Sequence, residues 1–155
     1  MGTTLTEVAD LFLSSISDYK LDTIYYNSGS IVLNTYIEPW LLKAINEFSS
    51  VCDQDLSYTV LSGNTDGYFT ETLTMENKII LSQHMELFWL QKGIQDFRSL
   101  NLVIQDHDFK THSPAQNTRA RTENYNSKRE ELSKRLAEYT YDKNDWDSWN
   151  LQVFS

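Results

Sequence analysis

The stretch that decides the fold is residues 74–97, TMENKIILSQHMELFWLQKGIQDF. Thr74 is a typical helix-capping residue, and the apolar side chains that follow recur at helical spacing. We therefore expect a long helix from Met75 to about Phe97. Its apolar residues cover more than half of the circumference, so the helix is expected to lie at the centre of a bundle or to pack in two directions. They are Ile79, Ile80, Leu81, Leu87, Phe88, Trp89, Leu90, Ile94 and Phe97.

Toward the N-terminus the sequence predicts further helices. Thr4 and Glu7 have the spacing of a capping box, so a helix is expected over residues 5–18. A turn or short helix from Leu21 to Tyr26 should end at residues 27–30. Residues 31–48 are predicted to be a helix that kinks or restarts at Pro39, although Ile31, Val32 and Leu33 also suit a strand. Residues 49–73 suggest a loop or small hairpin.

The part of the sequence after residue 97 differs from the rest in its pattern of apolar residues. Residues 98–113 are expected to form a connector, and Pro114 should open a last helix that ends near Tyr139. Its large apolar residues are only Tyr125, Leu132, Leu136 and Tyr139. A stripe this thin is not expected to hold so long a helix in a monomer's core, which indicates a partner surface. Residues 139–145 suggest a break before an aromatic tail.

These elements predict a mainly α protein, a small helical bundle with a long C-terminal helix and an extended tail for contacts between subunits. Residues 1–113 would form the body, with the loop or hairpin near 49–73. Residues 114–155 would form the C-terminal helix and the partner-docking tail.

The composition narrows the classes of function. The chain has 155 residues and a net charge of -9, which argues against a protein whose whole surface coats nucleic acid. Its aromatic content of 13% is too high for a disordered acidic tail. The single cysteine excludes an internal disulfide. No secretory signal and no membrane-length apolar run is visible, so a soluble chain made in the cytoplasm is expected.

The charge is unevenly distributed. Residues 110–135 reverse the acidic balance, with seven bases against three acids. One interpretation is a solvated helix face. The other is a basic segment that meets an acidic surface, such as the next subunit of an oligomer.

Motifs for catalysis are nearly absent. The sequence contains no P-loop, dinucleotide-binding fingerprint, His-Glu-x-x-His or Gly-x-Ser-x-Gly, so no enzyme and no cofactor are expected. Residues 106–108 (Asp-His-Asp) with His112 offer metal-ligating atoms, but a hydrogen-bonded polar loop is favoured and no metal is expected. Cys52 is expected to be a packed cysteine, and His84 a half-buried structural histidine.

The aromatic tail has two possible roles. Its tryptophans, three residues apart, could fold back on their own domain or dock on another subunit, where Trp is enriched as an anchor. We favour docking. The residues expected to anchor are Trp146, Trp149, Leu151 and Phe154, and those expected to pair with acidic neighbours are Arg119, Arg121, Lys128 and Arg129.

Several blocks, in this order and spacing, resemble the head-to-tail connector (adaptor or neck) proteins of tailed bacteriophages. Together they cover roughly residues 5–147. They are YIEPWLLKAINEF (36–48), CDQDL (52–56), residues 69–73, residues 85–90, Asn101-Leu102, Gln105-Asp106, Asp108-Phe109-Lys110, Ala115-Gln116-Asn117 and the ending 139–146.

The resemblance implies a structural virion protein, located in the neck and made in the host cytoplasm. Such adaptors are homo-oligomers, typically dodecameric rings, that bind the portal and provide a platform for a downstream neck or tail protein. They extend the DNA channel used in genome ejection, without sequence-specific DNA binding and without a membrane. A long C-terminal helix and tail commonly engage the portal in this family. An acidic channel would let DNA slide, because it repels phosphates.

A second hypothesis comes from a different class. The basic helix over residues 110–135 could belong to a nucleic-acid-binding regulatory protein. Such binding would weaken steeply with salt, because contacts to phosphates release counterions.

Overall fold

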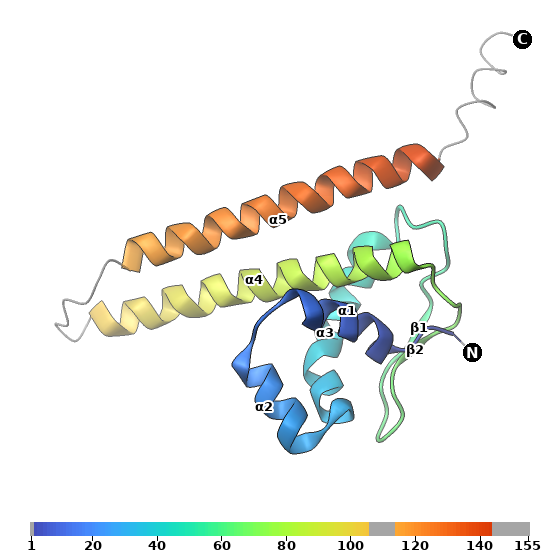
Figure 1. Ribbon diagram of the computed structural model, residues 1–155, viewed down its shortest axis with the longest axis horizontal. Coiled ribbons are helices and arrows are strands. Elements are labelled where there is room, and N and C mark those ends of the chain that lie inside the picture. Colours follow the sequence, from blue (N-terminus) through green and yellow to red (C-terminus); the bar gives the residue numbers. More distant parts are fainter. Residues whose placement is uncertain (1, 106–113, 144–155) are drawn as a thin grey trace, which may run out of the picture.

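The computed structural model describes residues 2–105 and 114–143 (Figure 1). Within these residues the chain is mainly helical, with one small antiparallel sheet, as the sequence predicted. The elements in order are α1 (Leu5–Ser15), α2 (Tyr19–Ser28), α3 (Ser30–Phe48), β1 (Tyr58–Thr59), β2 (Tyr68–Phe69), α4 (Met75–Gln105) and α5 (Pro114–Lys143).

The first helix begins at the predicted capping box. The Glu7 N–H donates to Thr4 Oγ1 at 3.3 Å, and the Thr4 N–H donates to the Glu7 carboxylate at 2.8 Å. The segment before it lies along β2, where the Phe69 N–H donates to the Thr3 carbonyl at 2.7 Å. This pairing fixes the start of α1 against the hairpin, and its apolar face is buried.

The helix expected over residues 5–18 ends three residues earlier, and the turn or short helix expected from Leu21 to Tyr26 is a helix over Tyr19–Ser28. α1 ends at Ser15, and Asp18 caps α2 by accepting from the Lys20 N–H at 2.9 Å. Asp18 has extended backbone, so the helix cannot continue through it. Gly29, with φ of 83°, separates α2 from α3 in the predicted breaker segment.

α3 resolves the helix-or-strand alternative for residues 31–38 in favour of helix. It runs from Ser30 to Phe48 without ending at Pro39, which is exposed. Residues 49–73 form the small hairpin, with Tyr58 opposite Phe69 and Thr59 opposite Tyr68.

The prediction that α4 ends near Phe97 was wrong, because the helix continues to Gln105. Residues 98–105 are therefore helix rather than connector. The last glycine before this segment is Gly93 and the next proline is Pro114, so no residue in it breaks a helix. The connection to α5 lies within residues 106–113, outside the described residues, as does the candidate metal-ligating group there.

α4 lies at the centre of the bundle, as predicted, and packs against α1, α3 and α5. Figure 1 shows α4 and α5 side by side as a long antiparallel pair, with α1, α2 and α3 on the other side of α4. The fully buried core joins all four of the packed helices and the hairpin. Its largest members are Tyr139, Phe12, Phe48, Phe69, Leu5, Ile37, Leu41, Ile80, Leu81 and Met85.

Candidate partner-docking surface

The two halves of α5 are held very differently. In the second half, Leu132 and Tyr139 are buried in the common core, with Leu136 packed against them. The thin apolar stripe therefore does hold this part of the helix on its own chain, which differs from the expectation. None of residues 116–131 is buried. The first half of α5 thus leaves most of its surface available to another molecule.

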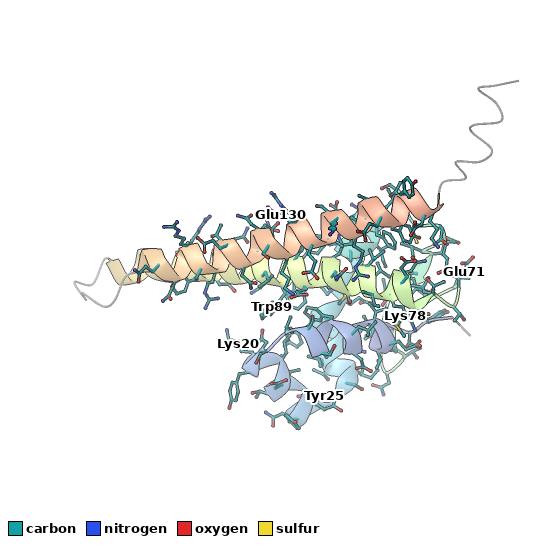
Figure 2. The ribbon with its side chains drawn as sticks, turned by 45° about the horizontal axis from the view of Figure 1, so that its top comes forward. Lys20, Tyr25, Glu71, Lys78, Trp89 and Glu130 are labelled. Carbon is teal, nitrogen blue, oxygen red and sulfur yellow. The ribbon has the colours of Figure 1, made fainter. Side chains whose placement is uncertain are left out.

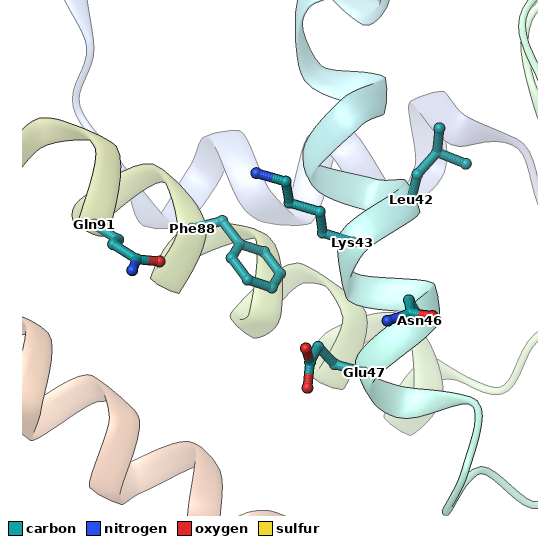
Figure 3. A pocket seen from close by; sticks show the side chains of 6 residues that line it. All are labelled: Leu42, Lys43, Asn46, Glu47, Phe88 and Gln91. Atoms are coloured by element: carbon teal, nitrogen blue, oxygen red, sulfur yellow. The ribbon is translucent and has the colours of Figure 1, made fainter. Parts of the chain in front are cut away.

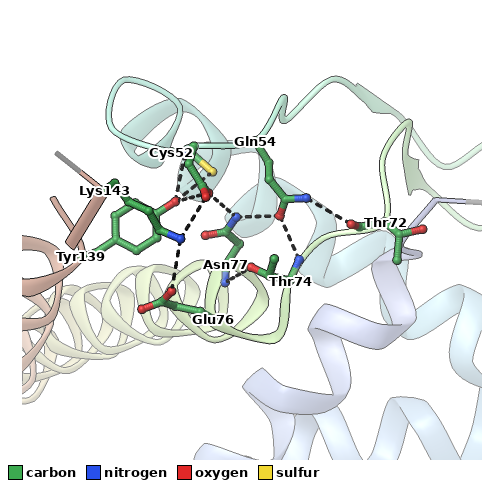
Figure 4. Close-up of polar contacts among 9 residues, drawn as sticks. Cys52, Gln54, Thr72, Thr74, Glu76, Asn77, Tyr139 and Lys143 are labelled. Carbon is green, nitrogen blue, oxygen red and sulfur yellow. Dashed lines mark hydrogen bonds and ion pairs between the residues drawn. The ribbon is translucent and has the colours of Figure 1, made fainter. Parts of the chain in front are cut away.

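The second half of α5 is fixed by a polar cluster at the start of α4 (Figure 4). The Tyr139 hydroxyl accepts from the Asp53 N–H at 2.9 Å and donates to the Asp53 carboxylate. Lys143 Nζ lies 3.0 Å from Asp53 Oδ2 and 3.8 Å from Glu76 Oε2. Asn77 Nδ2 donates to Asp53 Oδ1 at 3.0 Å. These contacts keep residues 139–143 helical, where a break was predicted.

The electrostatics of this cluster follow from its contacts. The hydrogen bonds from Asn77 and Tyr139 lower the pKa of Asp53 to about 2. Burial, together with the bond to Asp53, raises the pKa of Tyr139. Burial also raises the pKa of Cys52, whose Sγ lies 3.8 Å from the Tyr139 hydroxyl. A thiol with a raised pKa is a poor nucleophile.

His84 is buried on α4, as expected for a structural histidine. Its ring centroid lies 6.3 Å from that of Phe48, and burial lowers its pKa. Within the part of the chain that the structure describes, no group of three His, Cys, Asp or Glu side chains could hold a metal ion. No helix of the described part has the length and hydropathy of a membrane span.

The four basic residues predicted to pair with acidic neighbours all lie on α5. Arg119 pairs with Glu123 at 3.0 Å on the same helix, and Lys128 Nζ lies 3.6 Å from Glu86 of α4. Arg121 stacks over Phe97 at 5.0 Å from the ring centroid, and Arg129 lines a small pocket beside His84. The Arg119–Glu123 pair is exposed, and such pairs contribute about 0–1 kcal/mol, so a partner can replace it at little cost. Glu86 is buried, so Lys128 is the less replaceable of the two bases. The predicted anchors Trp146, Trp149, Leu151 and Phe154 lie outside the described residues.

Sequence reasoning missed a groove of about 760 Å³ between α2 and the second half of α4. Five of its lining residues are aromatic, and most of its polar lining residues are charged. Trp89 Nε1 donates to Asp18 Oδ2 at 2.8 Å, which ties α4 to the cap of α2. The lining aromatic residues are Tyr19, Tyr36, Trp40, Trp89 and Phe97, and the charged ones are Asp18, Lys20, Lys92, Asp96 and Arg121.

A signal for this groove exists in the sequence. Tyr36 lies outside the buried stripe of α3 and is 58% exposed, whereas the expectation that Tyr19 belongs to the apolar stripe of the first helix was wrong, because Tyr19 begins α2 and is 85% exposed. Exposed tyrosines beside buried stripes are typical of binding surfaces. Their convergence with Trp89 could not be foreseen, because it depends on how α2 and α3 pack on α4.

Two smaller pockets lie on the surface between α3 and α4. One, of about 470 Å³, is lined by Leu42, Lys43, Asn46, Glu47, Phe88 and Gln91 (Figure 3). Lys43 Nζ lies 5.7 Å from the centroid of the Phe88 ring. The other, of about 290 Å³, shares Glu47 and Phe88 and reaches Arg129 of α5. Each has fewer aromatic lining residues than the groove beside α2.

No protein-family description, curated protein or solved structure matches this chain. Its function must therefore be inferred from its own residues and their geometry.

Proposed function

We propose that the chain is a structural virion protein of a tailed bacteriophage, a ring-forming head-to-tail adaptor that links the portal to the tail or neck and extends the DNA channel. Two independent observations support this. Sequence blocks between residues 36 and 146 resemble the connector family in their order and spacing, and the fold contains a long helical pair with one largely unpacked half.

The observation that carries the proposal is the first half of α5. Between residues 116 and 131 it presents Arg119, Arg121, Lys128 and Arg129 without a buried residue. It lies beside the second half of α4, which extends past the other helices (Figure 1). A basic, polar helix that projects from an acidic body suits docking on an acidic surface of a larger assembly. We assign Arg119, Lys128 and Arg129 of this half to the portal contact.

Mixing the purified chain with the portal of its phage tests the proposal. Rings of the chain on the portal, seen by negative-stain imaging, are expected. The double variant Arg119→Glu/Arg129→Glu should lose them, whereas Lys43→Glu, an exposed lysine of α3, should retain them. A chain that stays a discrete monomer in the presence of the portal overturns the proposal.

The second candidate, a nucleic-acid-binding regulator, rests on the same basic face of α5. Two bases of this face, Arg119 and Lys128, already have carboxylate partners within 4 Å, which weakens its attraction for phosphates. DNA affinity that falls by orders of magnitude between low and physiological salt would favour this function over the adaptor.

A further inference from the structure

We infer that the groove beside α2 binds residues 144–155 of a second copy of this chain. The inference rests on the proposed function, because it supplies the contact between neighbouring copies in the ring. It assigns the aromatic tail to the neighbouring copy rather than to the portal. Three observations carry it: the surface of the groove, its unpaired charges, and the distance between the groove and the tail of the same chain.

The groove has the surface of a binding site for an aromatic segment. It is lined by two exposed tyrosines, Tyr19 and Tyr36, together with Trp40, Trp89 and Phe97. Tyr25 and Tyr26, about two turns further along α2 and outside the groove, are 51% and 84% exposed. A group of large apolar side chains left open in this way marks an interaction site. Figure 2 shows Lys20 of α2 and Trp89 of α4, which both line the groove.

Two cations of the groove have no carboxylate partner among the residues that the structure describes. Lys92 pairs with Asp96 at 2.8 Å, and Asp18 accepts from Trp89 and caps α2. Within the described residues, Lys20 and Arg121 have no carboxylate partner, and Arg121 contacts only the Phe97 ring among the interactions found. The groove is thus an aromatic site bordered by two available positive charges.

Residues 144–155 have the complementary composition. Asp145 and Asp147 flank Trp146, a second tryptophan follows at Trp149, and no lysine or arginine occurs after Lys143. Two acids beside an aromatic anchor match two cations beside an aromatic groove. This chemistry selects the tail over the segment 106–113, which carries a single aromatic residue and a lysine of its own.

The tail of the same chain cannot place Trp146 in this groove. Lys143 pairs with Glu76 at the start of α4, whereas the nearest groove residue of α4, Trp89, lies about 20 Å further along the helix. Trp146 follows Lys143 by three residues, which span at most about 11 Å when fully extended. An occupant that places Trp146 in the groove must therefore come from another copy.

The contact joins two different surfaces, so it is heterologous. Each copy offers one tail and one groove, and such a contact forms a ring when its rotation closes. This is the kind of contact that an adaptor ring requires.

Binding of a labelled synthetic peptide of residues 144–155 to the full-length chain, followed by fluorescence anisotropy, tests the inference. The protein is kept at a concentration at which sedimentation velocity shows monomers, so that the groove is open. Saturable binding is expected, and a peptide with both tryptophans replaced by alanine should not bind. The Lys20→Glu/Arg121→Glu protein should bind at least about tenfold more weakly, and a peptide with Asp145→Lys and Asp147→Lys should recover affinity for it.

Arg129→Glu is the matched control, because Arg129 is also an arginine of α5 that lines a pocket, on a different surface. It should leave peptide binding unchanged. No saturable binding up to about 1 mM peptide overturns the inference, as does equal affinity for the wild type and the Lys20→Glu/Arg121→Glu variant. A loss caused by Arg129→Glu instead also overturns it, because the tail would then dock elsewhere.

A second arm uses two full-length variants that each lack one half of the contact. Trp146→Ala/Trp149→Ala and Lys20→Glu/Arg121→Glu should each fail to self-associate, and their mixture should contain a heterodimer joined by one intact tail and groove. The portal is absent from both arms. A negative result in these two arms therefore contradicts the contact between copies. A negative result in the portal experiment contradicts the adaptor function.

Discussion

The Tyr139 hydroxyl accepts a hydrogen bond from the Asp53 N–H at 2.9 Å and donates one to the carboxylate of the same residue. The two residues lie 86 positions apart in the sequence. Their contact joins the last turn of α5 to the segment that follows α3. It therefore decides whether the second half of α5 belongs to the core of its own chain.

Removal of this hydroxyl should destabilise the whole domain. Tyr139→Phe keeps the edge-to-face packing on Phe48, whose ring centroid is 5.5 Å away, but leaves the Asp53 N–H without its acceptor. An unsatisfied polar group of this kind costs about 1–3 kcal/mol in the free energy of unfolding, measured by urea denaturation. Tyr26→Phe, at a tyrosine that is 84% exposed, should change it by less than about 0.5 kcal/mol. Equal effects of the two substitutions would contradict the role of the hydroxyl.

The same cluster predicts a loss of stability in acid. The pKa of Asp53 is about 2 in the folded chain and has an ordinary value of 3.8. As the pH falls from about 4 to about 2, the unfolded chain takes up the proton first, so the contribution of Asp53 to stability is lost across this range. Above about pH 4, the contribution of Asp53 to stability is fully present.

Asp53→Asn tests this pH dependence. The variant should be less stable than the wild type at neutral pH, and the difference should narrow as the pH approaches 2, in urea denaturation curves at a series of pH values. Asp10→Asn, at an exposed carboxylate of α1, should give a curve parallel to the wild type. A constant difference for Asp53→Asn at all pH values would show that its charge is not the stabilising feature.

Local features of the fold could be predicted, because the interacting residues are close in sequence. The capping box of Thr4 and Glu7, the breaker at Gly29 and the apolar face of α4 each depend on a few neighbouring residues. The end of α4 was misplaced, since a segment without glycine or proline carries no strong local stop signal.

The site depends on contacts between distant residues, and these could not be predicted. Tyr139 was recognised as part of an apolar stripe, but its partner Asp53 belongs to another element. The groove combines residues of four helices, so no segment of the sequence contains it. The basic residues of α5 could be identified, whereas the intrachain ion pairs that some of them form could not.

Two glycines should respond to alanine in opposite directions. Gly29 has φ of 83° and ψ of 177°, a conformation almost confined to glycine, so Gly29→Ala should cost about 1–3 kcal/mol although its Cβ would meet no atom. Gly93 lies within α4, and its Cβ would lie 3.8 Å from Arg121 Nη1, an ordinary contact. Gly93→Ala should therefore stabilise the fold by up to about 1 kcal/mol. Thermal unfolding of both variants measures whether each substitution raises or lowers the stability of the fold. Destabilisation by Gly93→Ala would show that α4 is constrained at this position.

Hydrogen exchange should divide α5 into two parts. Residues 116–131 contain no buried side chain, whereas Leu132 and Tyr139 are 3% and 1% exposed. Local opening requires less free energy where few apolar contacts are broken, so amides of the first half should exchange faster than those of residues 132–143. Mass spectrometry of peptides from the two halves makes the comparison, with the buried segment 80–86 of α4 as the slow reference.

Leu132→Ala should move this boundary toward the C-terminus. The substitution removes the first core contact of α5 and costs about 2–5 kcal/mol, so the turns near residue 132 should then exchange like the first half. Ser133→Ala, at the exposed neighbouring position, should leave the pattern unchanged. Uniformly slow exchange along the whole helix would mean that α5 is held equally over its length, and its first half would then not be free to repack on a portal. Fast exchange confined to residues 116–131 supports the surface on which the proposed function rests.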